Sequence, residues 1–190
     1  KYPAPQTQPI RDGVFRLLYA GQISPQKGVE FLIETVVKLA QTHKVELTVL
    51  GDGPQRTDLE ARFGHLTCIH FMGAVSLQAV ADHMAQSDLL CTPSLWFENL
   101  PGVIIQALCQ GLPVVASDTG GIPELVTHNV NGQLLPPGDP DSWYAGLASI
   151  IEAPTVIDAW SKNALAGANR FSPERATDEY LSFMHMIIGQ

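Results

Sequence analysis

Short apolar runs alternate with amphipathic segments along almost the whole chain, and this alternation restricts the fold more than any other feature. Six runs are typical of β-strands: residues 15–20, 45–50, 68–72, 89–92, 113–117 and 131–135. Segments with helical spacing of apolar residues lie between them; the first places Val29, Leu32, Ile33, Val36, Val37 and Ala40 on one face. Strands that alternate with helices form βαβ units, which require parallel strands and right-handed crossovers. The sequence therefore predicts an α/β fold.

Both faces of the predicted sheet are expected to be covered by helices. The runs at 89–92 and 113–117 are apolar at consecutive positions, whereas a strand with one wet face alternates apolar and polar residues. We therefore predict a Rossmann-like doubly wound parallel sheet of about six strands with helices on both faces. The chain has 190 residues, 45% of them hydrophobic, which is enough for one domain with a substantial core. We assign residues 14–190 to that domain, including helices at the carboxyl end.

Composition excludes several other classes of protein. The net charge of -8, without a cluster of lysine or arginine, argues against a nucleic-acid partner. Cys68, Cys91 and Cys109 lie in apolar segments without metal-type spacing, as reduced cytosolic thiols do. No membrane-spanning run or signal peptide is visible, so a cytoplasmic location is predicted. Residues 1–13 are rich in proline and glutamine and begin without methionine, which suggests an interdomain linker in a longer protein.

Five loops follow predicted strands and should meet at one edge of the sheet. They span residues 21–27, 51–54, 73–75, 98–103 and 119–124. In open parallel sheets, ligands bind beyond the carboxyl ends of the strands, where such loops gather. Five candidate loops at one edge indicate a binding site more strongly than any of them alone.

The fourth loop combines a carboxylate with the start of a helix. Glu98 follows the strand at 89–92, and Pro101 and Gly102 fall in the first turn of the expected helix 101–110. Proline suits the first helical position because its missing amide proton would have no intrahelical partner. The free amides of that turn and the positive end of the helix dipole form an anion site. A carboxylate beside such a site can bind sugar hydroxyls while the amides hold phosphate, which predicts a nucleotide-sugar pocket.

In order and spacing, these loops resemble the donor-binding domain of retaining glycosyltransferases with the two-Rossmann-domain (GT-B) architecture, specifically family 4, glycosyl transferases group 1. The resemblance covers about residues 15–188. Its marks are Ala20–Gly28, Gly51–Pro54, Phe71–Gly73, Pro93–Ser94 with Glu98–Asn99, Ala107–Leu108 with Gly111–Ser117, and Gly120–Glu124. It implies the carboxyl-terminal domain of an enzyme that uses a nucleoside-diphosphate sugar, without a cofactor or a required metal. The acceptor would bind an amino-terminal domain absent from this chain, and any membrane contact would be made only through that domain.

The resemblance also assigns roles to residues. Glu98 would contact hydroxyls of the donor sugar and Lys27 the diphosphate, so both are candidate catalytic residues. The candidate substrate-binding residues are Gly21, Gln22, Asp52, Gly53, Val75, Asn99, Leu100, Gly102, Val103, Gln106, Gly120 and Gly121. Val75 is assigned to backbone contact with the base. Two positions depart from the family: Gln22 replaces an arginine on the diphosphate, and Gln106 replaces a glutamate on the ribose. At each, a charge-assisted bond of ~1.5–3 kcal/mol is lost or becomes an ordinary bond of ~0.5–1.5 kcal/mol.

Three of the motifs have a plainer interpretation beside the functional one. Gly51–Pro54 resembles half of a dinucleotide fingerprint, yet it lacks the third glycine, and a simple strand-to-helix turn explains it equally well. Gly120–Gly121 either lets a phosphate or sugar approach closely or forms a tight turn. Asp139–Asp141 matches an Asp-x-Asp metal motif in letters, but it follows a glycine and opens a helix, where acidic residues favour the dipole. We therefore predict no metal site, and no two histidines have the spacing of metal ligands.

These observations predict a donor domain that transfers a sugar, with retention, to an unknown acceptor. Helix amides near Gly102 and Val103, together with Lys27, would stabilise the leaving diphosphate, and Glu98 would orient the sugar. By resemblance, the departing phosphate takes the acceptor proton. The isolated domain is expected to bind nucleotide weakly and to transfer little sugar. Two alternatives remain: a degenerate, non-catalytic nucleotide-sugar binding module, and a sugar-nucleotide epimerase of the same architecture. A phosphorylase would require a lysine for pyridoxal with supporting phosphate contacts, a constellation that the sequence lacks.

Overall fold

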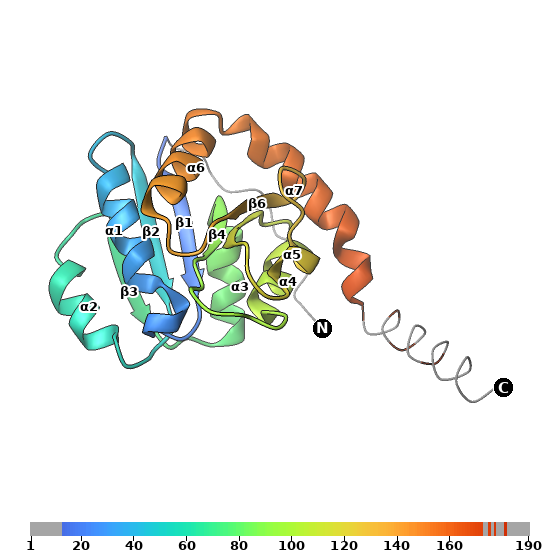
Figure 1. Cartoon of the computed structure of the whole chain (residues 1–190), viewed down its shortest axis with the longest axis horizontal. Helices are drawn as coiled ribbons and strands as arrows, with labels where there is room; N and C mark the ends of the chain where they lie inside the picture. Colours follow the sequence, from blue (N-terminus) through green and yellow to red (C-terminus); the bar gives the residue numbers. More distant parts are fainter. Residues whose placement is uncertain (1–12, 173–174, 176, 178–180, 182–190) are drawn as a thin grey trace.

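A computed structural model describes residues 13–172, 175, 177 and 181, and within this part six strands form one parallel sheet. They are β1 (Phe15–Ala20), β2 (Val45–Leu50), β3 (Ile69–Gly73), β4 (Leu89–Thr92), β5 (Val114–Ser117) and β6 (Gly132–Leu135). Their order across the sheet is β3-β2-β1-β4-β5-β6 (Figure 1). The connections run in opposite directions on the two sides of the β1–β4 pair, which makes this pair the topological switch point. The predicted six-stranded doubly wound fold is confirmed.

Helices cover both faces of the sheet. They are α1 (Val29–Leu39), α2 (Arg56–Phe63), α3 (Leu77–Ala85), α4 (Gly102–Cys109), α5 (Ile122–Leu125), α6 (Pro140–Glu152) and α7 (Thr155–Gly167), with 3₁₀ turns η1 (Pro25–Lys27) and η2 (Ala168–Phe171). No helix of the described residues is long and apolar enough to cross a membrane. Most residues beyond 172, where part of the carboxyl-terminal helices was expected, and almost all of the proposed linker lie outside the described residues.

The core consists of two apolar layers on either side of the sheet. In β1, Leu17 and Tyr19 face one layer and Leu18 faces the other, as the alternation of side chains along a strand requires. The first layer packs α1 and α6 side by side against the sheet, and the second packs α3, α4 and α5 (Figure 1). Helix α7 joins both layers, through Trp160 on one side and Ala164 on the other. This double burial explains why the strand runs are continuously apolar.

Local sequence signals account for the positions of several helix ends. Ser76 caps α3, where its hydroxyl accepts the Ala79 amide proton at 3.2 Å. Gly111 follows α4 with a φ of 75°, a left-handed conformation that favours glycine. Pro101 differs slightly from the prediction, because it is the residue before the first helical position rather than part of the first turn. Its φ of -61° and ψ of 112° are extended, and its carbonyl accepts the Ile104 amide at 3.0 Å.

The acidic segment at the start of α6 is a helix cap. Asp139 Oδ1 accepts hydrogen bonds from the amides of Asp141 and Ser142, and Oδ2 accepts one from the Ser142 hydroxyl at 2.7 Å. The bonds from Ser142 are the main cause that holds the pKa of Asp139 below its usual value. Both of its oxygens are therefore used by the helix itself, which agrees with the prediction of a helix start.

Candidate functional site

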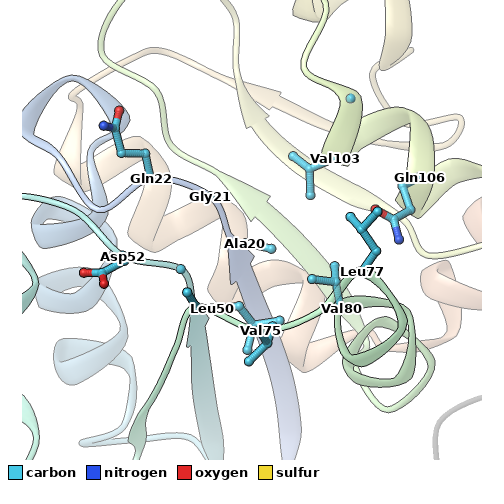
Figure 2. A pocket seen from close by; sticks show the side chains of 13 residues that line it. Ala20, Gly21, Gln22, Leu50, Asp52, Val75, Leu77, Val80, Val103 and Gln106 are labelled. Atoms are coloured by element: carbon cyan, nitrogen blue, oxygen red, sulfur yellow. The ribbon is translucent and has the colours of Figure 1, made fainter.

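A pocket of about 610 Å³ opens at the switch point, where the loops after β1, β2 and β3 face the start of α4 (Figure 2). It is lined by Ala20, Gly21, Gln22, Leu50, Gly51, Asp52, Ala74, Val75, Leu77, Val80, Gly102, Val103 and Gln106. The predicted substrate-binding residues among them are Gly21, Gln22, Asp52, Val75, Gly102, Val103 and Gln106. In Figure 2, Gln22 and Asp52 lie at one end of the pocket and Gln106 at the other. The structure therefore joins residues from four of the five predicted loops.

The interior of this pocket is mostly apolar. Its aliphatic lining consists of the side chains of Leu50, Val75, Leu77, Val80 and Val103 (Figure 2), of which Leu77 is largely exposed to solvent. Among the residues that line the pocket, Asp52 alone carries a charge. Ligand pockets commonly combine such walls with a few polar groups that fix orientation. This arrangement suits a ligand with one flat, weakly polar part and hydroxyl groups beside it.

The polar groups within reach of that ligand come from α4. Gln106 is 8% exposed, and within the described residues its side-chain amide makes no hydrogen bond, so the amide is available to a ligand. The amide protons of Gly102 and Val103 lie in the first turn of the helix, where the intrahelical partners are missing. Such amides and the helix dipole favour an anion at this end of α4.

Gly51 allows the loop after β2 to contact the loop after β1. A Cβ atom at Gly51 would lie 1.8 Å from the carbonyl oxygen of Gly21, and its φ is 131°. The Ile23 amide donates to the Asp52 carbonyl at 2.9 Å, and Asp52 Oδ1 accepts the amide of Gly53 at 2.8 Å. The segment 51–54 is thus a turn, as one of the two interpretations held, and this turn also forms one wall of the pocket.

Lys27 and Glu98, the two candidate catalytic residues, form an ion pair with each other beside the pocket. Lys27 Nζ lies 2.5 Å from Glu98 Oε1, although the residues are 71 positions apart. The Ser94 hydroxyl donates to the same carboxylate oxygen at 2.8 Å. The Lys27 side chain is 34% exposed and that of Glu98 15% exposed. We call Lys27, Ser94 and Glu98 the polar cluster; none of the three is among the residues that line the pocket.

Gly120 and Gly121 pack closely against the backbone of Glu98 and Asn99. Added Cβ atoms would lie 2.1 Å from the Glu98 carbonyl oxygen at Gly120 and 1.9 Å from the Asn99 carbonyl oxygen at Gly121. The Gly121 amide donates to the Glu98 carbonyl at 2.7 Å. The sequence suggested that these glycines admit a ligand or form a tight turn. In the structure their missing side chains allow the backbone of Glu98 and Asn99 to approach closely, and neither glycine lines the pocket.

The family model described as glycosyl transferases group 1 matches residues 14–153, well over half of the chain. The chain belongs to this family. An uncharacterized glycosyltransferase of Methanocaldococcus jannaschii is 31% identical over 145 residues, which cover 75% of this chain and 37% of that protein. The phosphatidyl-myo-inositol mannosyltransferase of Mycolicibacterium smegmatis is 31% identical over 151 residues, which cover 76% of this chain and 39% of the other.

Among solved structures, the HepE protein of Anabaena in complex with UDP-glucose is similar to this chain. The TM-score is 0.78 at 29% sequence identity, and the match covers 91% of this chain and 49% of HepE. The chain therefore spans between about two fifths and half of the length of these relatives. The GT-B type of fold expected from the loops agrees with these similarities.

In this group 1 glycosyltransferase chain, Tyr19 bonds to the loop after β1, which carries both Gln22 of the pocket and Lys27 of the polar cluster. Its buried hydroxyl donates to the Gln22 carbonyl at 2.7 Å, which fixes the backbone of the loop after β1. Burial, and to a smaller extent the negative charge of Glu98, raise the pKa of Tyr19. The phenol therefore stays protonated at neutral pH and remains a hydrogen-bond donor.

The remaining predicted residues lie away from the pocket lining. Asn99 and Leu100 are exposed in the loop before α4, and Gly53 packs against Ile23. The same loop carries exposed apolar side chains, with Phe97 90% exposed. No group of three or more His, Cys, Asp or Glu residues in the described part of the chain is arranged to hold a metal ion.

Sequence reasoning missed some residues of the site. The lining residues that were not among the candidate residues are Ala20, Leu50, Gly51, Ala74, Leu77 and Val80. Gly51 and Ala74 belong to predicted loops, and Ala20, Leu50 and Leu77 lie within two positions of one. Val80 lies five positions beyond the nearest predicted loop, within α3, and had no such signal. Ser94 was noted only as a family mark, and its contact with Glu98 was not predicted. A polar residue two positions after a buried strand was the available signal.

Proposed function

We propose that this chain is the carboxyl-terminal donor-binding domain of a retaining family 4 glycosyltransferase and that it binds a nucleoside-diphosphate sugar. The observation that carries the proposal is the position of the pocket: it lies at the switch point of the sheet, between the start of α4 and the loops after β1, β2 and β3. The complexes of HepE with UDP and with UDP-glucose support the same ligand class here.

The ligand divides naturally over the groups of the site. The base and ribose occupy the apolar pocket, with the Val75 backbone beside the base and the Gln106 amide beside the ribose hydroxyls. The diphosphate lies at the first amides of α4, at Gly102 and Val103, where the helix dipole favours negative charge. Gly21 and Gln22 face the diphosphate from the other side. The proposal includes no cofactor and no metal.

Catalysis in this proposal depends on stabilising the leaving group. Charge develops on the diphosphate as the bond to the sugar breaks, and preorganised amides together with the Lys27 ammonium group stabilise it. Glu98 accepts a hydrogen bond from a sugar hydroxyl and so orients the ring while the anomeric carbon gains oxocarbenium character. The departing phosphate takes the proton of the acceptor hydroxyl, and the sugar keeps its anomeric configuration.

The acceptor site is assigned to another domain of a longer protein. The relatives are about twice as long as this chain or longer, which supports that assignment. Transfer then occurs in a cleft between the two domains, in the cytoplasm, and any membrane contact is made by the other domain. We therefore expect the isolated chain to bind donor weakly and to transfer little or no sugar.

A calorimetric titration tests this function directly. UDP-, GDP- and ADP-sugars are titrated into the chain, and one of them is expected to bind. Lys27→Met should weaken the binding by about tenfold or more, because a charge-assisted bond of ~1.5–3 kcal/mol is lost. Lys162→Met removes an exposed lysine of α7 and should leave the affinity unchanged. The proposal fails if no sugar nucleotide binds, or if Lys27→Met binds as tightly as the wild type.

A non-catalytic binding module is the second candidate. It is favoured by the charges around the pocket, because Gln22 stands where the family has a cation, and the residues that line the pocket include no lysine or arginine. Assays of the longer protein distinguish the two: turnover of the bound donor supports the transferase, whereas binding without turnover supports the module. Conversion of the sugar nucleotide without any acceptor would instead indicate an epimerase.

A further inference from the structure

Ser94 is a buried serine whose hydroxyl contacts the carboxylate of Glu98. It lies two residues beyond β4 and is 1% exposed, and its hydroxyl donates to Glu98 Oε1 at 2.8 Å. We propose that Ser94 is a positioning residue, which holds Oε1 of Glu98 so that Oε2 is presented to a hydroxyl of the donor sugar. This inference rests on the proposed function of the chain as a sugar-nucleotide binding domain.

The backbone around Ser94 is fixed on both sides. Before it, the Pro93 carbonyl packs closely against Gly28: a Cβ atom added at Gly28 would lie 2.1 Å from the Pro93 carbonyl oxygen. After it, the Leu95 amide donates to the Gln26 carbonyl at 2.8 Å. A buried hydroxyl between two such contacts has little freedom to move. Supporting residues of this kind keep a functional side chain close to its productive geometry.

Ser94 and Lys27 bind the same oxygen of Glu98 but differ in mobility. The lysine has a flexible stem and one third of its side chain is exposed, whereas the serine is buried. A diphosphate beside α4 competes with Glu98 for the ammonium group of Lys27. When Lys27 turns towards the diphosphate, the hydroxyl of Ser94 still bonds the carboxylate. Gly121 donates to the main-chain carbonyl of Glu98 and therefore cannot replace this bond to the side chain.

The two carboxylate oxygens of Glu98 have different surroundings. Oε1 accepts hydrogen bonds from Lys27 and from Ser94, and no hydrogen bond joins Oε2 to another of the described residues. Because the bonds to Oε1 fix the orientation of the carboxylate, Oε2 can accept a hydrogen bond from a hydroxyl group in a defined direction. Ser94 therefore affects recognition of the sugar part of the donor rather than recognition of the nucleotide part.

Binding of UDP and of UDP-glucose separates these two parts. Calorimetric affinities for both ligands are measured for the wild type, Ser94→Ala, Ser94→Thr and Ser117→Ala. For Ser94→Ala, UDP affinity should stay within about twofold, whereas UDP-glucose affinity should fall about five- to tenfold, as expected for loss of a bond to a charged group. Ser94→Thr keeps the hydroxyl and should restore the UDP-glucose affinity to within about threefold.

Ser117 is the matched control because it is also a buried serine at the carboxyl end of a strand. It closes β5, and its hydroxyl has no hydrogen-bond partner within the described residues. Ser117→Ala should change neither affinity. A double-mutant cycle adds a stricter test: in a Glu98→Ala background, Ser94→Ala should no longer change the ratio of the UDP and UDP-glucose affinities, because the side chain that it positions is gone.

Each result decides between the inference and its alternatives. If Ser94→Ala weakens UDP and UDP-glucose equally, Ser94 has only a structural role and the inference is overturned. An unchanged ratio in Ser94→Ala also overturns it, as does a wild type that binds both ligands equally. If the wild type binds UDP and UDP-glucose equally, the chain still binds a nucleotide and only the inference on Ser94 fails. If the wild type binds neither ligand, the proposed function fails as well. If Ser94→Thr fails to fold in a thermal scan, Ser94→Cys, which keeps a weaker donor, should give an intermediate ratio.

Discussion

The pocket and the polar cluster share the loops after β1 and β4, but different interactions hold them in place. The pocket is shaped by aliphatic side chains and by close backbone contacts such as that between Gly51 and Gly21. Among the described residues, the Gln106 side chain and the first amides of α4 have no hydrogen-bond partner, whereas Asp52 accepts the Gly53 amide. In the polar cluster, by contrast, Lys27 and Glu98 neutralise each other, and Ser94 adds a further bond.

This difference indicates how a ligand enters each region. At Gln106 and the first amides of α4, the pocket needs no rearrangement of hydrogen bonds before a base and ribose enter, because these groups hold no partner among the described residues. The polar cluster must exchange a partner, since Lys27 cannot bind a diphosphate fully while it holds Glu98. Affinity for the nucleotide should therefore depend on packing in one region and on competition between charges in the other. Four substitutions test this comparison.

The largest change, in the free energy of unfolding, is expected from Gly121→Ala, because the new side chain would clash with the backbone beside the polar cluster. The added Cβ atom would lie 1.9 Å from the Asn99 carbonyl oxygen, so the loop before α4 must shift. We expect urea unfolding to show a loss of about 2–3 kcal/mol. Gly167→Ala adds a Cβ atom with no other atom within 4 Å and should change stability by at most about 1 kcal/mol. Equal stability of the two variants would contradict close backbone packing behind Glu98.

Tyr19→Phe tests whether one buried phenol stabilises the loop between the two regions. The pKa of Tyr19 in the folded chain is raised above its usual value of about 10, so its contribution to stability is complete below pH 10 and is lost as the pH rises further. Between pH 10 and 11, the wild type should lose up to about 1.4 kcal/mol per pH unit more than the variant. Urea unfolding at both pH values measures this. Parallel curves for the two proteins would show that the phenol ionises equally in the folded and unfolded chain.

Gln106→Glu tests the polar end of the pocket. A carboxylate bonds ribose hydroxyls more strongly than an amide does, so UDP affinity at pH 8 should rise about fivefold, while the free chain becomes less stable. The gain should fade towards acid pH because a buried carboxyl group takes up a proton readily. Gln110, the residue directly after α4, is equally buried but contacts Met84 and not the pocket. Gln110→Glu should therefore lose stability without any gain in affinity.

The smallest effect is expected from Glu98→Gln, which removes the competitor for Lys27. Because the Lys27 side chain is one third exposed, the ion pair contributes at most about 1 kcal/mol, and UDP affinity should rise about three- to fivefold. In a Lys27→Met background the same substitution should have no effect on UDP. An equal gain in both backgrounds would show plain repulsion between Glu98 and the diphosphate rather than an exchange of partners.

Sequence patterns predicted the elements of this fold well because those patterns are local. The runs at 45–50 and 89–92 form β2 and β4 with the same bounds. The predicted loops also meet at one edge, since the carboxyl ends of parallel strands must do so. Pro101 differed by one position, because a proline that precedes a helix and a proline that begins it leave the same mark in the sequence.

The contacts between loops were beyond the reach of those patterns. Gly120 and Gly121 were expected to approach a ligand or to form a tight turn, yet they approach the backbone of Glu98 and Asn99. Lys27 and Glu98 were both singled out, but nothing in the sequence indicated that they bind each other across 71 positions. The proposed positioning role of Ser94 depends on the loop conformation that places its hydroxyl beside Glu98.

By itself, then, the sequence determined the alternation of strands and helices, the doubly wound sheet and the edge at which the site lies. These follow from side-chain periodicity and from residues close together along the chain. The tertiary structure alone decided which loop residues contact one another, which of them line the pocket and how the charges pair. The reason is physical: such contacts depend on distances of a few ångströms between segments far apart in the chain, and those distances are set only when the two apolar layers pack against the sheet.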